Sequence, residues 1–455
     1  MKTSSRISKV FVGRASDTRG LHADGWFERA QVLTHELASQ ACRCVGLSAM
    51  VLLIGLTALS TAQAEPSSTE TAFSRWVATW ASPPVAPGTA PEPIRAFENQ
   101  TIRHVVHVSV GGNRVRVRLS NLFGVQPLRV GAAHVAVHAG GASIVPGTDR
   151  KLTFGGRSSF TIPAGGTALS DPVQFHVRAL SDLAVSIYVP MNTGPATYFG
   201  ADAPVAYASS PGNFARAIQM PVSETLTSRF WLTVVEVAPS ERIRGVVVAI
   251  GDSITKGRPS TRDGDGSWPS FLSRRLNTSH DGHSLSAINQ GIGCNRLLRD
   301  ICGPSGASRF QRDALSVAGV THVIAAFGLV DFALPTFSNI PAEVVSSDEI
   351  KDGLRDLIAR ARARGLKVYG TTITPHEGSI FLNFFTPENE VKRQAVNQWI
   401  RTSGEFDGVV DADAAIRDPS SPSRMLPLYA SEDNTHPNDA GHEAIANSID
   451  LSLFD

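Results

Sequence analysis

The chain has 455 residues, of which 42% are hydrophobic and 18% charged, a composition typical of folded proteins of about two or three domains and not of disordered chains. Its 42 Lys and Arg residues balance 41 Asp and Glu residues. Binding to nucleic acid or to an anionic membrane surface requires a basic excess that this chain lacks, so we expect neither partner. A small neutral or locally polar ligand is favoured.

An apolar stretch near the N-terminus, Val45–Ala64, ends in the small-x-small pattern Ala62-Gln63-Ala64. Such a stretch is typical of a cleaved signal peptide. Its strongly apolar part, Val45–Leu59, is shorter than the ~20 residues that span a bilayer, which disfavours a membrane anchor. We predict cleavage after Ala64, a secreted or periplasmic protein, and no stable membrane insertion afterwards. Residues 1–64 are therefore left out of the fold.

Two of the four cysteines remain after this cleavage. Cys42 and Cys44 precede the cleavage site, whereas Cys294 and Cys302 follow it. Exported proteins form disulfides, and no C-x-x-C motif or pair of nearby histidines indicates a metal site. We predict a Cys294–Cys302 disulfide, no metal and no cofactor.

Residues 65–241 alternate apolar and polar side chains with the period of two that is typical of β-strands. The valine-rich runs on either side of Gly111-Gly112-Asn113-Arg114 predict a β-hairpin. Frequent Gly and Pro separate the runs, so we expect an antiparallel β-sandwich. The alternating runs are Val106–Val110, Val115–Leu119, Val173–Val177 and Leu183–Val189.

This region contains no evident catalytic cluster. Its histidines, such as His104 and His107, alternate with apolar strand residues. We interpret them as surface or satisfied polar residues and not as ligands.

Residues 242–455 alternate short apolar runs with helical segments, the pattern of a parallel sheet covered on both faces. We predict a three-layer, doubly wound α/β domain. One helix carries apolar residues from Ile350 to Ala361 and stops at Gly365, and another begins near Pro387. The second helix is expected to place Val391, Ala395 and Trp399 on one face. The predicted strands are Val246–Ile250, Leu285–Asn289, His322–Phe327, Leu366–Ile373 and Gly408–Val410.

The first of these strands runs directly into Gly251-Asp252-Ser253. Such residues are also ordinary turn formers. In open α/β sheets, however, ligands bind outside the carboxyl ends of the strands. There the start of a helix presents N–H groups to a developing negative charge, so this position favours a functional serine.

A nucleophilic serine requires a base, and the C-terminal end of the chain provides one. Asp433 precedes His436 by three residues, before a predicted last helix at Asp439–Ile449. Asp433 can fix the imidazole tautomer so that the other ring nitrogen faces Ser253. Taken alone, this pair is also compatible with a surface loop.

Together these segments resemble the SGNH, or GDSL-type, hydrolase family. Gly251-Asp252-Ser253 matches the nucleophile block, Asn289-Gln290-Gly291-Ile292-Gly293 the glycine block, and Asp433-Asn434-Thr435-His436 the D-x-x-H block. The resemblance covers the C-terminal domain. The all-β region, which begins with Trp76–Trp80, looks like an accessory domain that some family members carry.

The resemblance implies a catalytic role for each matched residue. Ser253 would be the nucleophile, His436 the base and then the acid, and Asp433 the residue that orients the histidine. The backbone N–H groups of Ser253 and Gly291 would stabilise the oxyanion, and glycine would let the substrate carbonyl approach the backbone.

One block departs from the family pattern. Where the family has G-x-N-D, this chain has Gly328-Leu329-Val330-Asp331. Valine cannot donate a hydrogen bond, so the third oxyanion donor is missing, and such a donor is typically worth about 2.7–4 kcal/mol. Asn295 and Asn383 could replace it only if loops bring them close.

We therefore predict an exported serine esterase that acts through an acyl-enzyme. A content of 7% aromatic residues and no evident apolar lid favour short-chain acyl or acetylated carbohydrate esters. Trp268 is either part of a sugar site or a core residue. The sequence leaves open the identity of the ester, the oligomeric state and the role of the all-β region.

Two alternatives remain. Because of Val330, the protein is alternatively a weakened enzyme that binds an acylated sugar or lipid. A phosphate site at Gly251–Gly257 is weaker, because the loop lacks the four residues between glycine and Gly-Lys that cradle a nucleotide.

Overall fold

The computed structural model describes residues 75–89, 94–200, 205–258, 265–278 and 284–455. All of them lie in one compact unit, Ser67–Asp455. The predicted signal peptide, its cleavage site after Ala64, and Cys42 and Cys44 lie outside the described residues.

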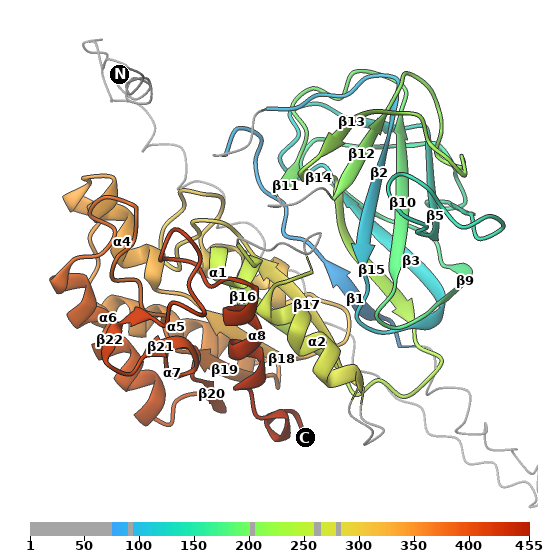
Figure 1. Ribbon diagram of the computed structural model, residues 1–455. Helices are drawn as coiled ribbons and strands as arrows, with labels where there is room; N and C mark the ends of the chain where they lie inside the picture. The colour runs from blue at the N-terminus through green and yellow to red at the C-terminus, as the bar shows by residue number, and fades with distance from the viewer. Residues whose placement is uncertain (1–74, 90–93, 201–204, 259–264, 279–283) are drawn as a thin grey trace, which may run out of the picture. The chain divides into compact units, whose positions relative to one another are not determined.

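Two antiparallel sheets form the all-β part of the chain (Figure 1). They share one apolar core, because alternate side chains of both sheets are buried in it. The first sheet has the order β1 (Val77–Ala81), β15 (Leu232–Ala238), β3 (Gly112–Ser120) and β8 (Thr167–Leu169), and β9 (Val173–Val177) also pairs with β3. The second has the order β13 (Val222–Leu226), β12 (Ala206–Ser209), β2 (Gln100–His107), β10 (Asp182–Val189), β5 (Ala132–Val137) and β6 (Arg150–Leu152). Two short pairs, β4 (Leu128–Val130) with β7 (Phe160–Ile162) and β11 (Tyr198–Gly200) with β14 (Ser228–Phe230), complete it.

The predicted hairpin between the two valine-rich runs is wrong. Strand β2 pairs with β10 and β12, whereas β3 pairs with β15 in the other sheet. The connection crosses between the sheets because Thr79 exchanges two hydrogen bonds with Val110, at 2.7 and 2.8 Å. A Cβ atom at Gly112 would lie 2.4 Å from the carbonyl oxygen of Ala238, so glycine is needed there for close packing.

The two histidines of this part differ from each other. His104 on β2 is fully buried, so a surface position is wrong for it. Burial lowers the pKa of His104 to about 3, and the ring is neutral. His107 is partly exposed, and Asp182 Oδ1 lies 2.7 Å from its Nδ1, whereas its Nε2 has no hydrogen-bond partner among the described residues.

The α/β part is built on a five-stranded parallel sheet. Its order is β17 (Ser286–Gly291), β16 (Val246–Gly251), β18 (Val320–Ala326), β19 (Lys367–Thr371) and β20 (Gly408–Val410). All five predicted strands are therefore present. The order reverses at β16, next to β18, and in such sheets this switch point is where ligands bind. Gly251, Gly291 and Ala326 end their strands in register at this point.

The helices lie along the chain between and after these strands (Figure 1). Helix α5 ends before Gly365, which has a positive φ of 71°, as predicted. The helical segments of the described residues are α1 (Ser253–Lys256), α2 (Trp268–Thr278), α3 (Gly306–Phe310) continued by a π-helical turn (Gln311–Leu315), α4 (Leu329–Phe337), a 3-10 turn (Pro341–Glu343), α5 (Ser347–Arg362), α6 (Pro387–Thr402), α7 (Ala412–Ile416), α8 (Asp439–Asn447) and a 3-10 turn (Leu451–Phe454). A small ribbon, β21 (Arg417–Asp418) and β22 (Ser421–Met425), follows α7.

The predicted face of α6 is also wrong. Val391 is 70% exposed, and the buried face instead carries two apolar and three polar residues, Val396, Ile400, Asn389, Arg393 and Asn397. Polar residues are buried there because they bind backbone groups. Arg393 Nη1 and Asn397 Nδ2 donate to the carbonyl of Ile373 at 2.9 and 2.8 Å.

Strand β1 connects the all-β part to the α/β part. The N–H of Ala78 donates to the carbonyl of Ala318, and its carbonyl accepts from Ser286 Oγ at 2.6 Å. Residues from both parts belong to the same apolar core. The division of the chain near residue 241 into two domains stays a prediction.

Candidate active site

Ser253 lies at the sharp turn that follows β16. Asp252 caps α1, because its Oδ1 accepts a hydrogen bond from the N–H of Ile254 at 2.9 Å. The helix ends after one turn at Gly257, whose φ is 99°. Ser253 is 7% exposed, and its backbone N–H has no acceptor among the described residues. The hydroxyl and this N–H are therefore both available at the carboxyl edge of the sheet.

The structure brings the three residues of the predicted triad together. His436 Nε2 lies 2.8 Å from Ser253 Oγ, and His436 Nδ1 lies 2.7 Å from Asp433 Oδ2. With Nδ1–H donating to the carboxylate, Nε2 is the acceptor that faces the serine hydroxyl. The imidazole is buried, so bulk water does not compete for this contact.

The loop before α8 fixes the carboxylate of Asp433. Its Oδ1 accepts from Ser431 Oγ at 2.8 Å and from the N–H groups of Thr435 and His436 at 2.9 Å each. Partial burial alone would raise the pKa of Asp433, but its hydrogen bonds to His436 and Thr435 and the charge of the imidazole outweigh that effect and hold it well below its usual range. The carboxylate is therefore ionised at neutral pH.

Gly291 does not offer its N–H as predicted. This N–H donates to Asn289 Oδ1 at 2.9 Å, so it already has a partner. Glycine is required for another reason: a Cβ atom at this position would lie 2.2 Å from the backbone nitrogen of Lys256. The close approach is between β17 and α1 and not between β17 and a substrate carbonyl.

The turn after β17 carries the disulfide. Cys294 and Cys302 are bonded, with their Cα atoms 5.6 Å apart. Cys294 has a positive φ of 50°, a conformation that side chains other than glycine adopt rarely and that persists mainly where surrounding structure enforces it. In the part of the chain that the structure describes, the N–H of Cys294 has no acceptor.

Val330 is the second residue of α4, which follows β18. It is 3% exposed, yet it belongs to neither apolar core cluster. The next residue, Asp331, is fully buried and accepts from the N–H groups of Leu297 and Leu298 at 2.7 and 3.1 Å. Asp331 thus ties the start of α4 to the disulfide-bearing loop, and Val330 adds no donor at this point.

Neither predicted substitute asparagine is in a position to fill the gap. The amide of Asn295 is buried and bound on both sides, donating to the carbonyl of Pro304 at 2.9 Å and accepting from Arg309 Nε at 3.0 Å. Asn383 is exposed in the loop before α6. Trp268, the other open case, is a buried core residue at the start of α2.

Arg309 on α3 was not singled out from the sequence. Its fully buried guanidinium donates to the carbonyls of Gly251 and Gln290 at 2.9 and 2.7 Å. It also binds Asn295, so one side chain holds the ends of β16 and β17 and the disulfide loop together. The sequence alone does not indicate this role. It becomes visible only when the fold places the buried arginine next to the two glycine-rich strand ends.

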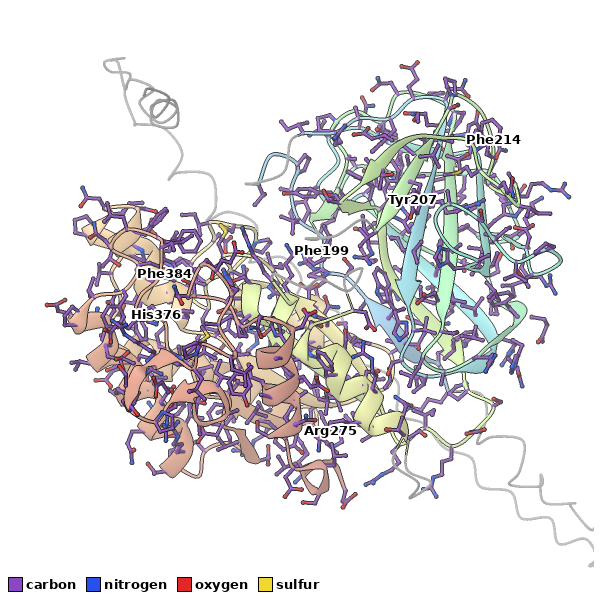
Figure 2. The ribbon with its side chains drawn as sticks, viewed as in Figure 1. Phe199, Tyr207, Phe214, Arg275, His376 and Phe384 are labelled. Atoms are coloured by element: carbon purple, nitrogen blue, oxygen red, sulfur yellow. A yellow bond between two sulfur atoms is a disulfide. The ribbon has the colours of Figure 1, made fainter. Side chains whose placement is uncertain are left out.

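Apolar side chains lie beside the triad histidine. The ring of Phe381 is 6.5 Å from that of His436, and Phe337 and Phe384 pack around Phe381. Figure 2 labels Phe384 next to His376, whose rings are 5.9 Å apart. Ile380 and Leu382 in the same loop are exposed. These rings place apolar surface beside His436, while the expectation of no apolar lid stays a prediction.

Two searches of the described residues found nothing. No group of three or more His, Cys, Asp or Glu side chains within them is placed to hold a metal ion. No helix within them is both long and apolar enough to cross a membrane.

Comparison with known proteins identifies relatives of the α/β part. Residues 249–444 match the model of the GDSL-like Lipase/Acylhydrolase family. Among solved structures, the chain is similar to a putative lipolytic protein of the G-D-S-L family from Desulfitobacterium hafniense, at 17% identity over 45% of this chain and 97% of that one, with a TM-score of 0.33. An acetylxylan esterase from Geobacillus stearothermophilus is 20% identical over 45% and 91%, with a TM-score of 0.35. A GDSL-like lipase from Bacteroides thetaiotaomicron is 18% identical over 46% and 88%, with a TM-score of 0.34. The search of curated proteins found no match.

Proposed function

We propose that this protein, whose residues 249–444 match the GDSL-like Lipase/Acylhydrolase family, is an exported serine esterase that works through an acyl-enzyme. The observation that carries the proposal is the continuous contact from Asp433 through His436 to Ser253, at 2.7 and 2.8 Å.

The proposed reaction has two halves. Ser253 Oγ attacks the ester carbonyl while its proton passes to His436 Nε2. The imidazolium, stabilised by Asp433, then gives this proton to the departing alkoxide, which leaves as the alcohol. Water attacks the acyl-enzyme with His436 again as base, and the carboxylic acid is released together with the regenerated serine.

For the oxyanion we propose the N–H groups of Ser253 and Cys294. Both lack acceptors among the described residues, whereas the N–H of Gly291 is taken by Asn289. The enforced conformation of Cys294 supports this choice, because strained backbone is retained where it orients a functional group. A crystal structure of a phosphonate adduct on Ser253 tests it through the contacts of the phosphoryl oxygen.

The proposed substrates are short-chain acyl esters or acetylated carbohydrates. The rings beside His436 provide apolar surface for a short acyl group. The disulfide supports export, since such bonds persist in oxidising compartments. We also propose the three-layer arrangement of the α/β domain, because right-handed crossovers place helices on both faces of a sheet with this strand order.

A second candidate rests on Val330. A buried valine at the family's asparagine position favours a weakened enzyme that binds an acylated sugar or lipid. The intact contacts among Ser253, His436 and Asp433 favour catalysis over this alternative.

Labelling with a fluorophosphonate tests the proposed function directly. We expect one adduct, on Ser253, because only a base-activated serine reacts at neutral pH. Mass spectrometry of the labelled peptide locates it, and His436→Ala is the matched control that should abolish labelling. Attachment to another serine, or equal labelling of the control, would overturn the triad.

A further inference from the structure

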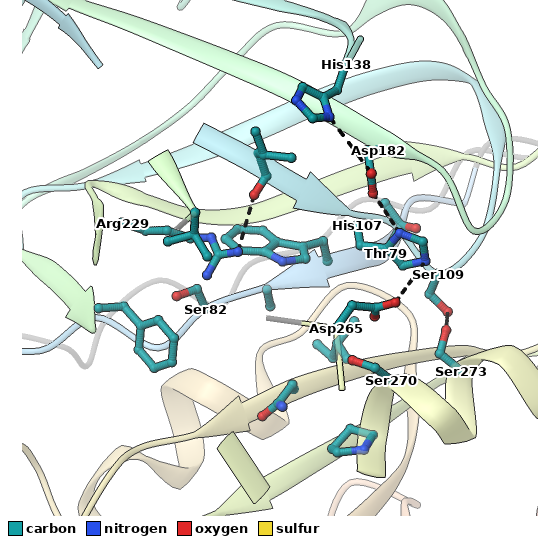
Figure 3. A pocket seen from close by; sticks show the side chains of 18 of the residues that line it. Thr79, Ser82, His107, Ser109, His138, Asp182, Arg229, Asp265, Ser270 and Ser273 are labelled. Atoms are coloured by element: carbon teal, nitrogen blue, oxygen red, sulfur yellow. Dashed lines mark hydrogen bonds and ion pairs between the residues drawn. The ribbon is translucent and has the colours of Figure 1, made fainter. Parts of the chain in front are cut away.

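A cavity of about 620 Å³ lies where the all-β part meets the α/β part, away from the triad. This volume is within the range of small-molecule sites, roughly 300–1,000 Å³. Neither Ser253 nor His436 lines it, although Lys256, the last residue of α1, and Asn289 do. Figure 3 shows Arg229 and Ser82 on one side of this cavity and His107, Asp182 and Asp265 on the other.

Arg229 is a buried cation without an anionic partner. It is 8% exposed, and no carboxylate of the described residues forms an ion pair with it. Within the described part of the chain, the only hydrogen bond of its side chain is from Nη2 to the carbonyl of Val105 at 3.3 Å, and Nε has no partner there. Burial lowers the pKa of Arg229 to about 10, so the group stays charged at neutral pH.

An unpaired buried charge costs several kcal/mol in the folded state. Proteins therefore pair such a group or expose it, and Arg229 lines the cavity. The buried hydroxyl of Ser82, on the same side of the cavity, also lacks a partner among the described residues. Arg229 Nε and Ser82 Oγ are two buried donor atoms without acceptors among the described residues, and both residues line one cavity, which indicates an anionic, oxygen-rich ligand.

The opposite wall offers both donors and acceptors. His107 Nδ1 is 2.7 Å from Asp182, and its Nε2 is 3.8 Å from Asp265 Oδ2. Asp265 is also paired with Arg274, and Ser270 lies beside it on this wall. Carboxylates together with an imidazole suit hydroxyl groups. A hydroxyl can donate a hydrogen bond to a carboxylate, and it can either donate to or accept from an imidazole nitrogen.

Aromatic side chains supply the apolar surface between these groups. Trp80, Phe199 and Tyr207 line the cavity. The guanidinium carbon of Arg229 lies 5.2 Å from the ring centroid of Trp80. A sugar ring matches both the aromatic and the polar side chains of this cavity, because its C–H faces pack on aromatic rings while its hydroxyls bind polar side chains.

We propose that this cavity binds an acidic saccharide, with the carboxylate of a uronic acid unit on Arg229 and Ser82 and its hydroxyls facing His107 and Asp265. The site is separate from the esterase centre and does not depend on the proposed catalytic function. It makes the junction of the two parts a recognition site for acidic polysaccharide.

Titration calorimetry on the full mature chain carrying Ser253→Ala tests the proposal, because that variant removes any turnover. The probes are trigalacturonate, the neutral α-1,4-galactotriose of equal length, and inorganic phosphate. We expect trigalacturonate to bind at least tenfold more tightly than galactotriose, and phosphate alone not to bind measurably. Absence of trigalacturonate binding, or equal binding of the neutral sugar, overturns the proposal, and phosphate binding as tight as trigalacturonate would show a bare anion site instead.

Variants of Arg229 locate the site. Arg229→Met removes the charge but keeps the length of the side chain, and should weaken trigalacturonate binding at least tenfold while leaving hydrolysis of p-nitrophenyl acetate by the Ser253 enzyme unchanged. Arg424→Met, which changes an exposed arginine paired with Glu377, is the matched control. If Arg229→Met does not fold, two other variants test the site. Ser82→Ala should bind trigalacturonate more weakly, and the charge-conserving Arg229→Lys should retain part of the binding. Unchanged binding in Arg229→Met, or in Ser82→Ala where Arg229→Met does not fold, overturns the assignment.

Discussion

Replacing Val330 with asparagine restores the donor that the family places at this position. Val330 lies on the first turn of α4, and its neighbour Asp331 is held by two backbone N–H groups of the disulfide loop. The helix and the bound Asp331 side chain therefore hold the backbone of Val330 in place. An added amide would contact the oxyanion mainly in the transition state, so kcat should rise and KM should change little.

The size of the gain follows from two opposing effects. Removing one oxyanion donor elsewhere costs ~10²–10³ in kcat, so about 10²-fold is the upper expectation for adding one. A pocket shaped around a buried valine can hold the amide off line, and a misplacement of ~1 Å removes much of the benefit. When no substrate is bound, the added amide is buried without a hydrogen-bond partner, which should lower the free energy of unfolding by about 1–3 kcal/mol.

Steady-state kinetics on p-nitrophenyl acetate, with thermal melting of the same samples, measure both effects. Val330→Ala is the matched control, since it opens the pocket without adding a donor. A higher kcat in Val330→Asn alone supports an incomplete oxyanion hole, and activity that appears from none supports the binding protein. An unchanged or lower kcat in a folded, already active protein means that another group fills the hole, which would refute our account of Val330. An equal gain in Val330→Ala would show a steric effect instead.

Three further predictions follow from the site. Reduction of the Cys294–Cys302 bond, whose ends are 8 residues apart, should lower activity more than stability, because a bond that closes so short a loop stabilises the fold by at most about 2–3 kcal/mol. Two free thiols in the unreduced, denatured mature protein, which lacks Cys42 and Cys44, would contradict the bond. Burial raises the pKa of Asp252 from 3.8 to about 7, so the folded state retains a proton that the unfolded state loses, and the free energy of unfolding should fall as pH rises from about 4 to about 7. Chemical denaturation at several pH values should show a smaller fall in Asp252→Asn, and an unchanged slope would argue against this burial effect. Arg309→Lys keeps the charge but loses the planar fork, and should lower kcat ~10-fold or more with the far-UV spectrum retained; wild-type kcat would mean that Arg309 does not position the strand ends.

Much of the architecture was predictable because it rests on local patterns. The apolar runs gave all five parallel strands, and the loops that hold Ser253 and the Asp433–His436 pair were identifiable from residue type and spacing. Interactions between distant residues were not predictable in this way. The two valine-rich runs fit a hairpin or a crossing equally well, and only the contact between Thr79 and Val110 decides between them.

Side-chain bonds to the backbone account for the remaining errors. Asn289 takes the N–H of Gly291, a choice that the motif does not reveal. The buried face of α6 combines the core residues Val396 and Ile400 with Arg393 and Asn397, which reach a carbonyl in another segment. Because polar residues share this face, apolar periodicity pointed to the wrong one. Arg309 acts on strand ends far from it in the sequence.

The position of β1 determines how this chain can be divided and in what order it can fold. This strand is made early, yet it pairs with β15 and hydrogen-bonds Ser286 and Ala318, all of which are synthesised much later. Contacts between such distant residues slow folding, so β1 has to stay unpaired while most of the chain emerges. A fragment that begins at residue 242 lacks the strand altogether and leaves the Ser286 hydroxyl and the Ala318 carbonyl without their partners. The α/β part therefore takes two of its hydrogen-bond partners from the first strand of the all-β part.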